Sequence, residues 1–257
     1  MTRARTFKFH RILNDLGVQI VSGRLTAGAL LPREADLSRR WRISRPSVRE
    51  ALKALAQKGL IEPRTRRGTT VNAKHSWNVL DADVLRWIAA TPPDRDFYRE
   101  LLELRTIVEP MAARLAAQRA SHETILALER TYHAMAHALP TQLEACVRHD
   151  LALHELIIMA SGNRLLMALA TTIRTALLSA FRLSTNARKS YANSLAEHWA
   201  VVAAIRKRSP EDAAQAMRDL LAGTARDIAP AFDRGRRATP ARGGQRTRRR
   251  KAGVRGG

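Results

Sequence analysis

The hydrophobic positions in the first quarter of the chain recur every three to four residues, which is the spacing of amphipathic helices. A shorter apolar stretch follows on each side of Gly68, and Gly59 ends the preceding helical pattern. The pattern predicts three helices and a β-hairpin, over residues 11–21, 34–41, 44–58, 61–64 and 69–72. A short helix, a three-residue turn and a longer helix make helix-turn-helix geometry, to which the hairpin adds a wing.

The pattern from residue 76 to residue 233 is almost entirely helical, rich in Ala, Leu and Arg. Breaks occur at Pro92–Pro93, Pro140 and Ser209–Pro210. The predicted helices cover residues 81–90, 94–120, 121–139, 142–160, 163–185, 191–208 and 210–229. The expected fold is therefore mainly α, with an N-terminal winged helix-turn-helix and a C-terminal all-helical bundle of six to seven helices.

The charge of the chain is distributed unevenly. Residues 1–75 hold 17 Lys/Arg against 5 Asp/Glu, residues 76–233 hold 18 of each, and residues 234–257 hold 10 basic and no acidic residues. We therefore divide the chain into a basic DNA-binding domain (1–75), a neutral effector-binding and dimerisation domain (76–233) and a basic tail (234–257). The tail has one apolar residue larger than Ala, Val254, and is expected to be disordered. Whether it contacts nucleic acid or is merely solvated stays open.

Composition excludes several classes of protein. The single cysteine, Cys146, excludes an internal disulfide framework and fits a reducing compartment. No run of about 18 apolar residues predicts a membrane span, and the N-terminus has no apolar segment of a secretory signal. We expect a cytoplasmic protein without a membrane partner.

The second helix of the predicted helix-turn-helix should enter the major groove of DNA. Ser44 is suited to cap it, and Pro46 is tolerated in its first turn. That turn is expected to present Arg45, Ser47 and Arg49 on its open side, where Arg can bridge the O6 and N7 atoms of guanine. The alternative is a solvated basic face, but the net charge of +12 on residues 1–75 and the basic hairpin favour DNA.

The stretch from residue 31 to residue 71 resembles the winged-helix domain of the GntR family of bacterial regulators. The resemblance rests on Leu31-Pro32, Ser44-Arg45, Val48-Arg49-Glu50-Ala51-Leu52, Gly59-Leu60-Ile61 and Gly68, in the family's order and spacing. Some relatives have Arg at the position of Ala35, and here Arg33 lies nearby. The expected DNA contacts are Arg33, Ser44, Arg45, Ser47, Arg49, Arg66, Arg67 and Gly68.

The predicted bundle carries one candidate binding site. Asp150 and His154 are four residues apart and share a helix face, and His198 lies on another helix. A carboxylate and imidazoles on facing helices are how bundles build metal sites, whereas the alternative is a set of hydrogen bonds only. Arg105 could anchor a carboxylate, or it could be a surface residue paired with Glu109 one turn away.

This part of the chain resembles the FCD-type effector domain of the FadR subfamily, through Glu103-Leu104-Arg105, Asp150-x3-His154 and Glu197-His198. The resemblance implies an acidic effector bound by Arg105, Asp150, His154 and His198. It also implies a divalent metal ion, zinc or similar, on Asp150, His154 and His198. Metal-binding members have a further histidine in the final helix, where this chain has Leu220. The implied ligand set is thus incomplete, and the three residues could instead hydrogen-bond a polyol acid without metal.

The segment Trp77-Asn78-x-Leu80-Asp81-x-Asp83 is similar to the linker of galactonate-responsive members of this subfamily. That similarity implies a homodimeric repressor that leaves operator DNA when it binds an aldonate such as D-galactonate. Another carboxylate effector, such as a hexuronate, and a nonspecific architectural role on DNA are the alternatives. No enzyme is expected, because the chain has no Gly-rich phosphate loop and no assembled nucleophile.

Overall fold

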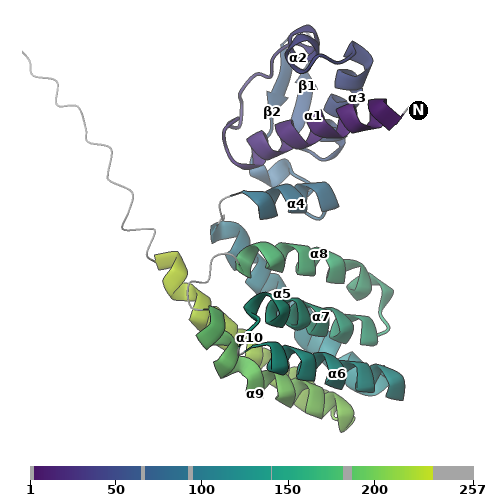
Figure 1. The fold of residues 1–257 in the computed structure, drawn as a ribbon, viewed down its shortest axis with the longest axis vertical. Coiled ribbons are helices and arrows are strands. Elements are labelled where there is room, and N and C mark those ends of the chain that lie inside the picture. The colour runs from purple at the N-terminus through teal and green to yellow at the C-terminus, as the bar shows by residue number, and fades with distance from the viewer. Residues whose placement is uncertain (1–2, 65–66, 92–94, 140, 182–186, 234–257) are drawn as a thin grey trace, which may run out of the picture.

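The computed structural model describes residues 3–64, 67–91, 95–139, 141–181 and 187–233, arranged as a small head above a helical bundle (Figure 1). The predicted tail and Arg66 lie outside these ranges. The head contains α1 (Arg3–Val21), α2 (Glu34–Trp41), α3 (Arg45–Gln57), β1 (Ile61–Arg64) and β2 (Gly68–Val71). The rest contains α4 (Ala82–Ala90), α5 (Arg95–Arg119), α6 (His122–Ala138), α7 (Leu143–Ala160), α8 (Arg164–Phe181), α9 (Ala187–Arg206) and α10 (Pro210–Asp233). The predicted fold class is confirmed.

The helix boundaries follow the capping signals of the sequence. The Asp81 side chain accepts hydrogen bonds from the first turn of α4, and Ser121 does the same for α6. Asn163 Oδ1 accepts from the backbone N–H of Leu165 at 3.0 Å and so caps the start of α8. The largest departure is α1, which begins at Arg3, eight residues before the predicted start.

The head is built around an aliphatic core. Leu37 of α2 and Val48, Ala51 and Leu55 of α3 are buried, and α3 packs against α1. β1 and β2 pair antiparallel, with Ile61 opposite Val71, so that both strands bury one end against this core. This packing holds α2 and α3 in the helix-turn-helix arrangement that the sequence predicts.

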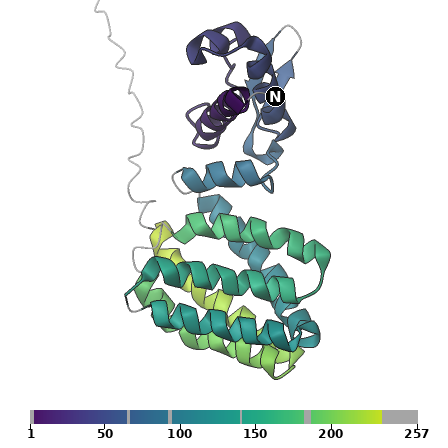
Figure 2. The same cartoon turned by 45° about the vertical axis from the view of Figure 1, so that its right-hand side comes forward.

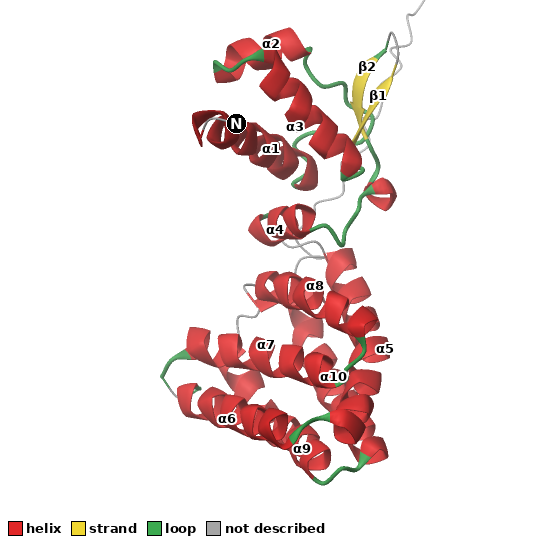
Figure 3. Ribbon diagram, turned by 90° about the vertical axis from the view of Figure 1, so that its right-hand side faces the viewer, coloured by secondary structure: helices red, strands yellow, loops and turns green. Residues whose placement is uncertain are grey.

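Helix α4 belongs to the core of the head, although it lies beyond the predicted boundary at residue 75. Val84, Trp87 and Ile88 are buried in the same apolar cluster as the α1 and α3 side chains. The Trp87 indole lies so close to Gly17 of α1 that a Cβ added there would be 2.5 Å from the ring. Figure 3 shows α4 between the head and the bundle, and α4 also packs against α8.

A second close contact fixes the segment that leads into α4. Gly59 has φ 74°, and a Cβ added there would lie 2.1 Å from the carbonyl oxygen of Ser76, so only glycine fits. Lys58 Nζ lies 2.8 Å from carboxylate oxygens of both Asp81 and Asp83. The end of α3 is thereby tied to the start of α4.

The remaining helices, α5 to α10, form the bundle (Figure 2). The long helix α5 packs against α7, α9 and α10, and α6 packs against α7 and α9. The main apolar core draws on α5, α6, α7, α9 and α10, and small residues of α5 such as Ala113 and Ala117 are fully buried in it. Close packing of these helices leaves a few polar side chains inside, and these form the candidate site.

Candidate DNA interface and buried effector site

The first turn of α3, the second helix of the helix-turn-helix, is exposed. Ser44 holds the N-cap position with an extended backbone, and Arg45, Pro46 and Arg49 are exposed. A helix N-terminus with free N–H groups and adjacent guanidinium groups suits phosphate and guanine contacts. Arg45 and Arg49 thus lie on the exposed side of this turn, and their contact with DNA stays a prediction.

Ser47 departs from the expectation, because its side chain is buried at 5% exposure instead of facing outward. Its hydroxyl lies 3.0 Å from the hydroxyl of Ser44, which makes no capping bond to the helix backbone. The reason is helical geometry, since Ser47 lies on the same stripe as the buried Ala51 and Leu55. Ser47 can reach DNA only through Ser44 or after a rotation of its side chain.

Arg49 is engaged within the head. Its guanidinium donates to both carboxylate oxygens of Glu34 on α2, at 3.3 and 3.0 Å, and these hydrogen bonds raise the pKa of Arg49. The pair joins the two helices of the helix-turn-helix at their outer surface. Within the described part of the chain, the Arg45 side chain forms no comparable ion pair, so Arg45 is the stronger candidate for base contact.

The other expected contact residues flank α3. Arg33 is exposed directly before α2, and Arg67 and Gly68 are exposed at the turn of the wing. Gly68 has φ 87°, a left-handed conformation that favours glycine, and it pairs with Arg64 across the hairpin. Arg66 lies outside the described residues.

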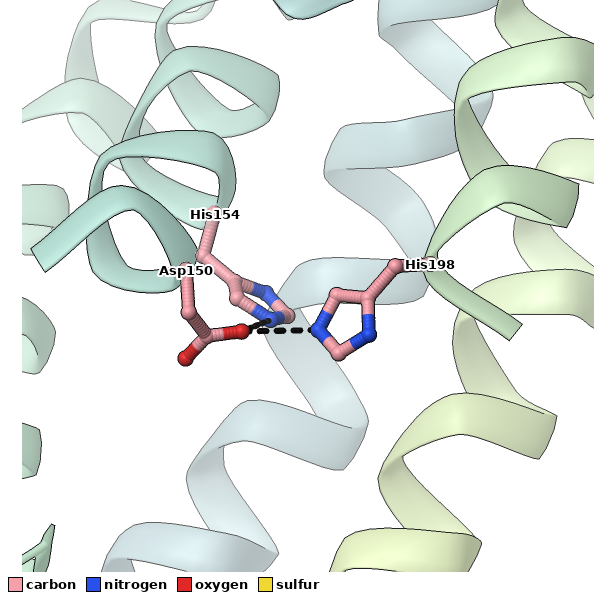
Figure 4. A group of neighbouring side chains, drawn as sticks. All are labelled: Asp150, His154 and His198. Carbon is pink, nitrogen blue, oxygen red and sulfur yellow. Dashed lines mark hydrogen bonds and ion pairs between the residues drawn. The ribbon is translucent and has the colours of Figure 1, made fainter. Parts of the chain in front are cut away.

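The bundle encloses a cluster of ionisable side chains. Asp150 and His154 on α7 face His198 on α9 (Figure 4), and all three are less than 10% exposed. Arg105 and Glu109 of α5 complete the cluster and are buried at 4% and 0% exposure. The structure thus brings together the four side chains expected to bind an effector.

The two imidazoles are oriented alike. His198 Nε2 lies 2.7 Å from Asp150 Oδ1, and His154 Nε2 lies 3.6 Å from the same oxygen. On the opposite ring edges, His154 Nδ1 lies 2.7 Å from Glu109 Oε2, and His198 Nδ1 lies 2.6 Å from the backbone oxygen of Ser194. Each ring therefore has an acceptor that fixes Nδ1–H and turns Nε2 towards the aspartate.

Arg105 is buried, and its guanidinium group is already hydrogen-bonded within the cluster. Its Nε and Nη2 donate to the two oxygens of Glu109, at 2.5 and 3.3 Å, and Nη2 lies 3.4 Å from both nitrogens of His154. The expected pairing with Glu109 is present, but inside the bundle. Glu109 bridges Arg105 and His154, and its contact with His154 was not predicted from the sequence.

The charges of this cluster stabilise one another. Burial alone would raise the pKa of Glu109, but the charges of Arg105 and His154 outweigh it and lower the pKa to about 2. Burial would lower the pKa of His154, but Glu109 and Asp150 raise it to about 9. Hydrogen bonds from both histidines hold the pKa of Asp150 well below its usual range despite its burial. Without metal, His154 is therefore an imidazolium at neutral pH.

The donor set fits a divalent ion. One atom each of Asp150, His154 and His198 lies within 4.8 Å of the others, and neighbouring acceptors fix both imidazoles, as in known histidine–metal sites. In such a site Nε2 of both histidines and Asp150 Oδ1 would hold the ion. Leu220, at the position of the missing fourth ligand, is 1% exposed within the apolar core and offers no donor atom. Three protein ligands leave room for water or an acid.

Comparison with known proteins identifies the families of both the head and the bundle. Residues 10–71 match the model of bacterial regulatory proteins, gntR family, and residues 100–223 match the FCD domain. The galactonate operon transcriptional repressor of Escherichia coli K12 is 33% identical over 86% of this chain and 96% of its own length. The chain belongs to the gntR family. It is a transcription regulator with an FCD domain, and not an enzyme.

A second relative agrees with this assignment, and a solved structure shows the same fold. The uncharacterized HTH-type transcriptional regulator YieP of Escherichia coli K12 is 32% identical over 82% of this chain and 90% of its own length. The structure of Lar, which controls expression of the Listeria monocytogenes agr system, shares the fold with a TM-score of 0.60 at 16% identity, covering 91% of this chain and 98% of that one. Among the described residues of this gntR-family regulator, every helix is too short or too polar to cross a membrane.

Proposed function

We propose that this regulator represses genes of sugar-acid catabolism and leaves its operator when it binds an aldonate such as D-galactonate. The observation that carries the proposal is the buried cluster of Arg105, Glu109, Asp150, His154 and His198, because ionisable groups inside an apolar bundle are suited to a polar ligand. The similarity to a galactonate operon repressor supplies the class of ligand.

On DNA, the chain acts as a homodimer, with each α3 in one half of a roughly palindromic operator. Arg45 and Arg49 contact bases or phosphates, and the first turn of α3 with Ser44 and Ser47 contacts the backbone. Arg33 and the wing, with Arg66, Arg67 and Gly68, reach the flanking backbone. Specific contacts should make operator binding on the order of 10³-fold tighter than binding to random DNA, unlike a nonspecific architectural protein.

In the bundle, the acid binds beside Arg105. Since Glu109 already holds this guanidinium, the effector carboxylate shares Arg105 with Glu109 or replaces it. The hydroxyl groups of an aldonate hydrogen-bond to Asp150, His154 and His198, or coordinate a divalent ion that these three residues hold. An ion would supply a positive charge that attracts the acid. The bound acid shifts the balance between two arrangements of the helices only if its affinity for the two differs.

A thermal-shift screen of the purified full chain tests the effector. D-galactonate, other aldonates, hexuronates and a non-acidic sugar are each added with EDTA or with zinc. A ligand at 100 times its Kd should raise the free energy of unfolding by about 2.7 kcal/mol. A shift with D-galactonate supports the proposal, a shift with hexuronates alone changes the effector, and no shift with any acid overturns the sensing role.

Variants assign the response to the cluster. His198→Ala should abolish the thermal shift and the release of operator DNA by D-galactonate, while operator binding without ligand stays intact. His137→Ala, which removes an exposed histidine of α6, is the matched control and should respond like the wild type. Zinc bound per chain, measured by mass spectrometry, should fall in His198→Ala if the ion site is used.

A further inference from the structure

The turn between α2 and α3 contains a residue in an unfavourable backbone conformation. Arg42 has φ 52° and ψ 52°, in the left-handed region that residues with a Cβ rarely adopt. The turn requires this conformation, because the N–H group of Ile43 donates to the carbonyl oxygen of Ser38 at 3.1 Å as the chain leaves α2. Glycine is the usual residue at this position of such a helix end. An arginine here therefore costs stability that a glycine would not.

The other residues with a left-handed backbone differ from Arg42. Among the residues that the structure describes, they are five glycines and Arg208, which has φ 57° and follows α9. The Arg208 guanidinium donates to the backbone oxygen of Ala117 at 3.5 Å, so this arginine has a partner inside the bundle. The Arg42 side chain is exposed, and in the described ranges it forms no ion pair or hydrogen bond. Contacts within the chain therefore give no reason for an arginine at this turn.

The arginines that precede Arg42 on α2 are engaged with neighbouring side chains. Arg39 pairs with Asp36, and the Arg40 guanidinium lies 5.4 Å from the centroid of the Trp41 ring. Arg42 instead belongs to the turn that leads into the exposed first turn of α3. Figure 3 shows α2 and the start of α3 at the end of the head that points away from the bundle, so a large partner can approach this turn. An exposed guanidinium beside the helix that reads DNA is suited to a phosphate.

We propose that Arg42 binds a phosphate of the DNA backbone next to the bases that α3 contacts, and that this contact compensates for the unfavourable turn. The inference rests on the proposed binding of α3 to operator DNA. Strained backbone is found preferentially at functional sites, and here the strained residue is also exposed and basic. Because a phosphate carries no sequence information, Arg42 adds affinity for every DNA sequence, whereas Arg45 is the candidate for base contact.

Substitutions of Arg42 in the full chain separate the contact from the strain. Arg42→Gly and Arg42→Ala should each weaken DNA binding by about 3- to 10-fold at fixed salt, because both remove one phosphate contact. Arg42→Lys keeps the charge and should retain most of the affinity. The melting temperature should rise in Arg42→Gly alone, because only glycine relieves the left-handed turn. Fluorescence anisotropy measures binding to two duplexes, one that the wild-type chain selects from a random-sequence library and one that is unselected.

A second arginine of this protein provides the matched control. Arg208→Gly removes the same charge and the same left-handed arginine from the bundle, and it should leave the affinity for both duplexes unchanged. The slope of log affinity against log salt concentration should become shallower by about 1 in Arg42→Gly and Arg42→Ala, and should match the wild type in Arg42→Lys and Arg208→Gly. Both duplexes should lose affinity by the same factor, so that the preference for the selected one is kept.

Several outcomes would overturn the inference. Wild-type affinity in Arg42→Gly or Arg42→Ala would show that the side chain does not touch DNA, and an equal loss in Arg208→Gly would show that only the net charge matters. A loss confined to the selected duplex would indicate a base contact instead of a phosphate contact. A lower melting temperature in Arg42→Gly than in Arg42→Ala would remove the argument from strain. A wild-type chain that binds both duplexes equally would instead overturn the proposed reading of an operator, and the unselected duplex would still test Arg42.

Discussion

The head and the bundle place their charges in opposite ways. In the head, the buried side chains form an aliphatic core and the arginines lie on the surface, on the helix-turn-helix and the wing. In the bundle, the overall charge is balanced, but Arg105, Glu109, Asp150 and His154 are enclosed. An external field suits a long polyanion, whereas an enclosed and balanced cluster suits a single small ligand. The head and the bundle thus differ in function because of where their charged side chains lie, rather than because of how many they have.

Removal of one carboxylate from each region should show this difference most strongly. Glu109→Ala leaves Arg105 buried without its counter-ion, removes one of the two carboxylates beside His154, and should lower the free energy of unfolding by about 3–5 kcal/mol. Glu62→Ala in the wing removes an exposed pair with Arg64 and should change it by less than about 1 kcal/mol. Urea denaturation measures both, and equal losses would contradict the distinction.

The contact that holds α4 in the head can be perturbed by a single methyl group. Gly17→Ala places a Cβ against the Trp87 ring and should lower stability by about 1–3 kcal/mol, although alanine favours helices. Gly223→Ala in α10 has its nearest neighbour at 3.6 Å and should instead raise stability by about 0.5–1 kcal/mol. Thermal unfolding of the two variants compares them, and a stabilised Gly17→Ala would mean that α4 is not held against α1.

On the surface of the head, the position of a charge should matter more than its number. Arg45→Ala should weaken operator binding by about 1–3 kcal/mol without loss of stability. Arg130→Ala removes the same charge from an exposed site on α6 and should leave operator affinity unchanged. Fluorescence anisotropy with operator DNA at fixed salt distinguishes them. Equal losses would indicate that net charge alone drives binding.

The enclosed cluster should respond to pH where the surface of the head does not. The pKa of His154 is raised from 6.5 to about 9, so its contribution to stability is complete below pH 6.5 and is lost as the pH rises towards 9. The pKa of Glu109 is lowered to about 2, so its contribution is complete above about pH 4.5 and is lost in stronger acid. With EDTA present, unfolding free energies between pH 6.5 and 9 should fall in the wild type and stay flatter in His154→Gln. A His137→Gln control that flattens equally would contradict the assignment.

Most of the fold could be predicted from local signals. Asp81, Ser121 and Asn163 marked helix starts that the structure confirms, and the hairpin around Gly68 followed from short strands at a glycine. The membership of α4 in the head could not be predicted, because the contact of Trp87 with Gly17 joins residues far apart in sequence. Periodicity identifies an apolar face but not the element that covers it.

The candidate site could be predicted only in part, again because periodicity does not show which helices meet. Asp150 and His154 share a face by their spacing, but the meeting of α7 with α9 and α5 is tertiary. The importance of Glu109 had a signal in the sequence, since Arg105 and Glu109 lie on the apolar stripe of α5 with Val108 and Ala112. A charged pair on a buried stripe indicates an internal ion pair. Ser47 had the same kind of signal, because it is on the stripe of Ala51 and Leu55.

The packing of α4 defines the unit that can be exchanged between regulators. A chimera cut at residue 75 would separate the head from Val84, Trp87 and Ile88, and would leave an apolar groove on α1 for an unrelated linker to fill. A cut after Ala90 keeps Trp87 against Gly17 and Lys58 against Asp81, so the donor head would keep α4 as part of its core. The foreign bundle then needs to match the face that α4 presents to α8 and the contact of Phe97 on α5 with the head core. The boundary of the exchangeable head therefore lies one helix later in the chain than the sequence motifs indicate.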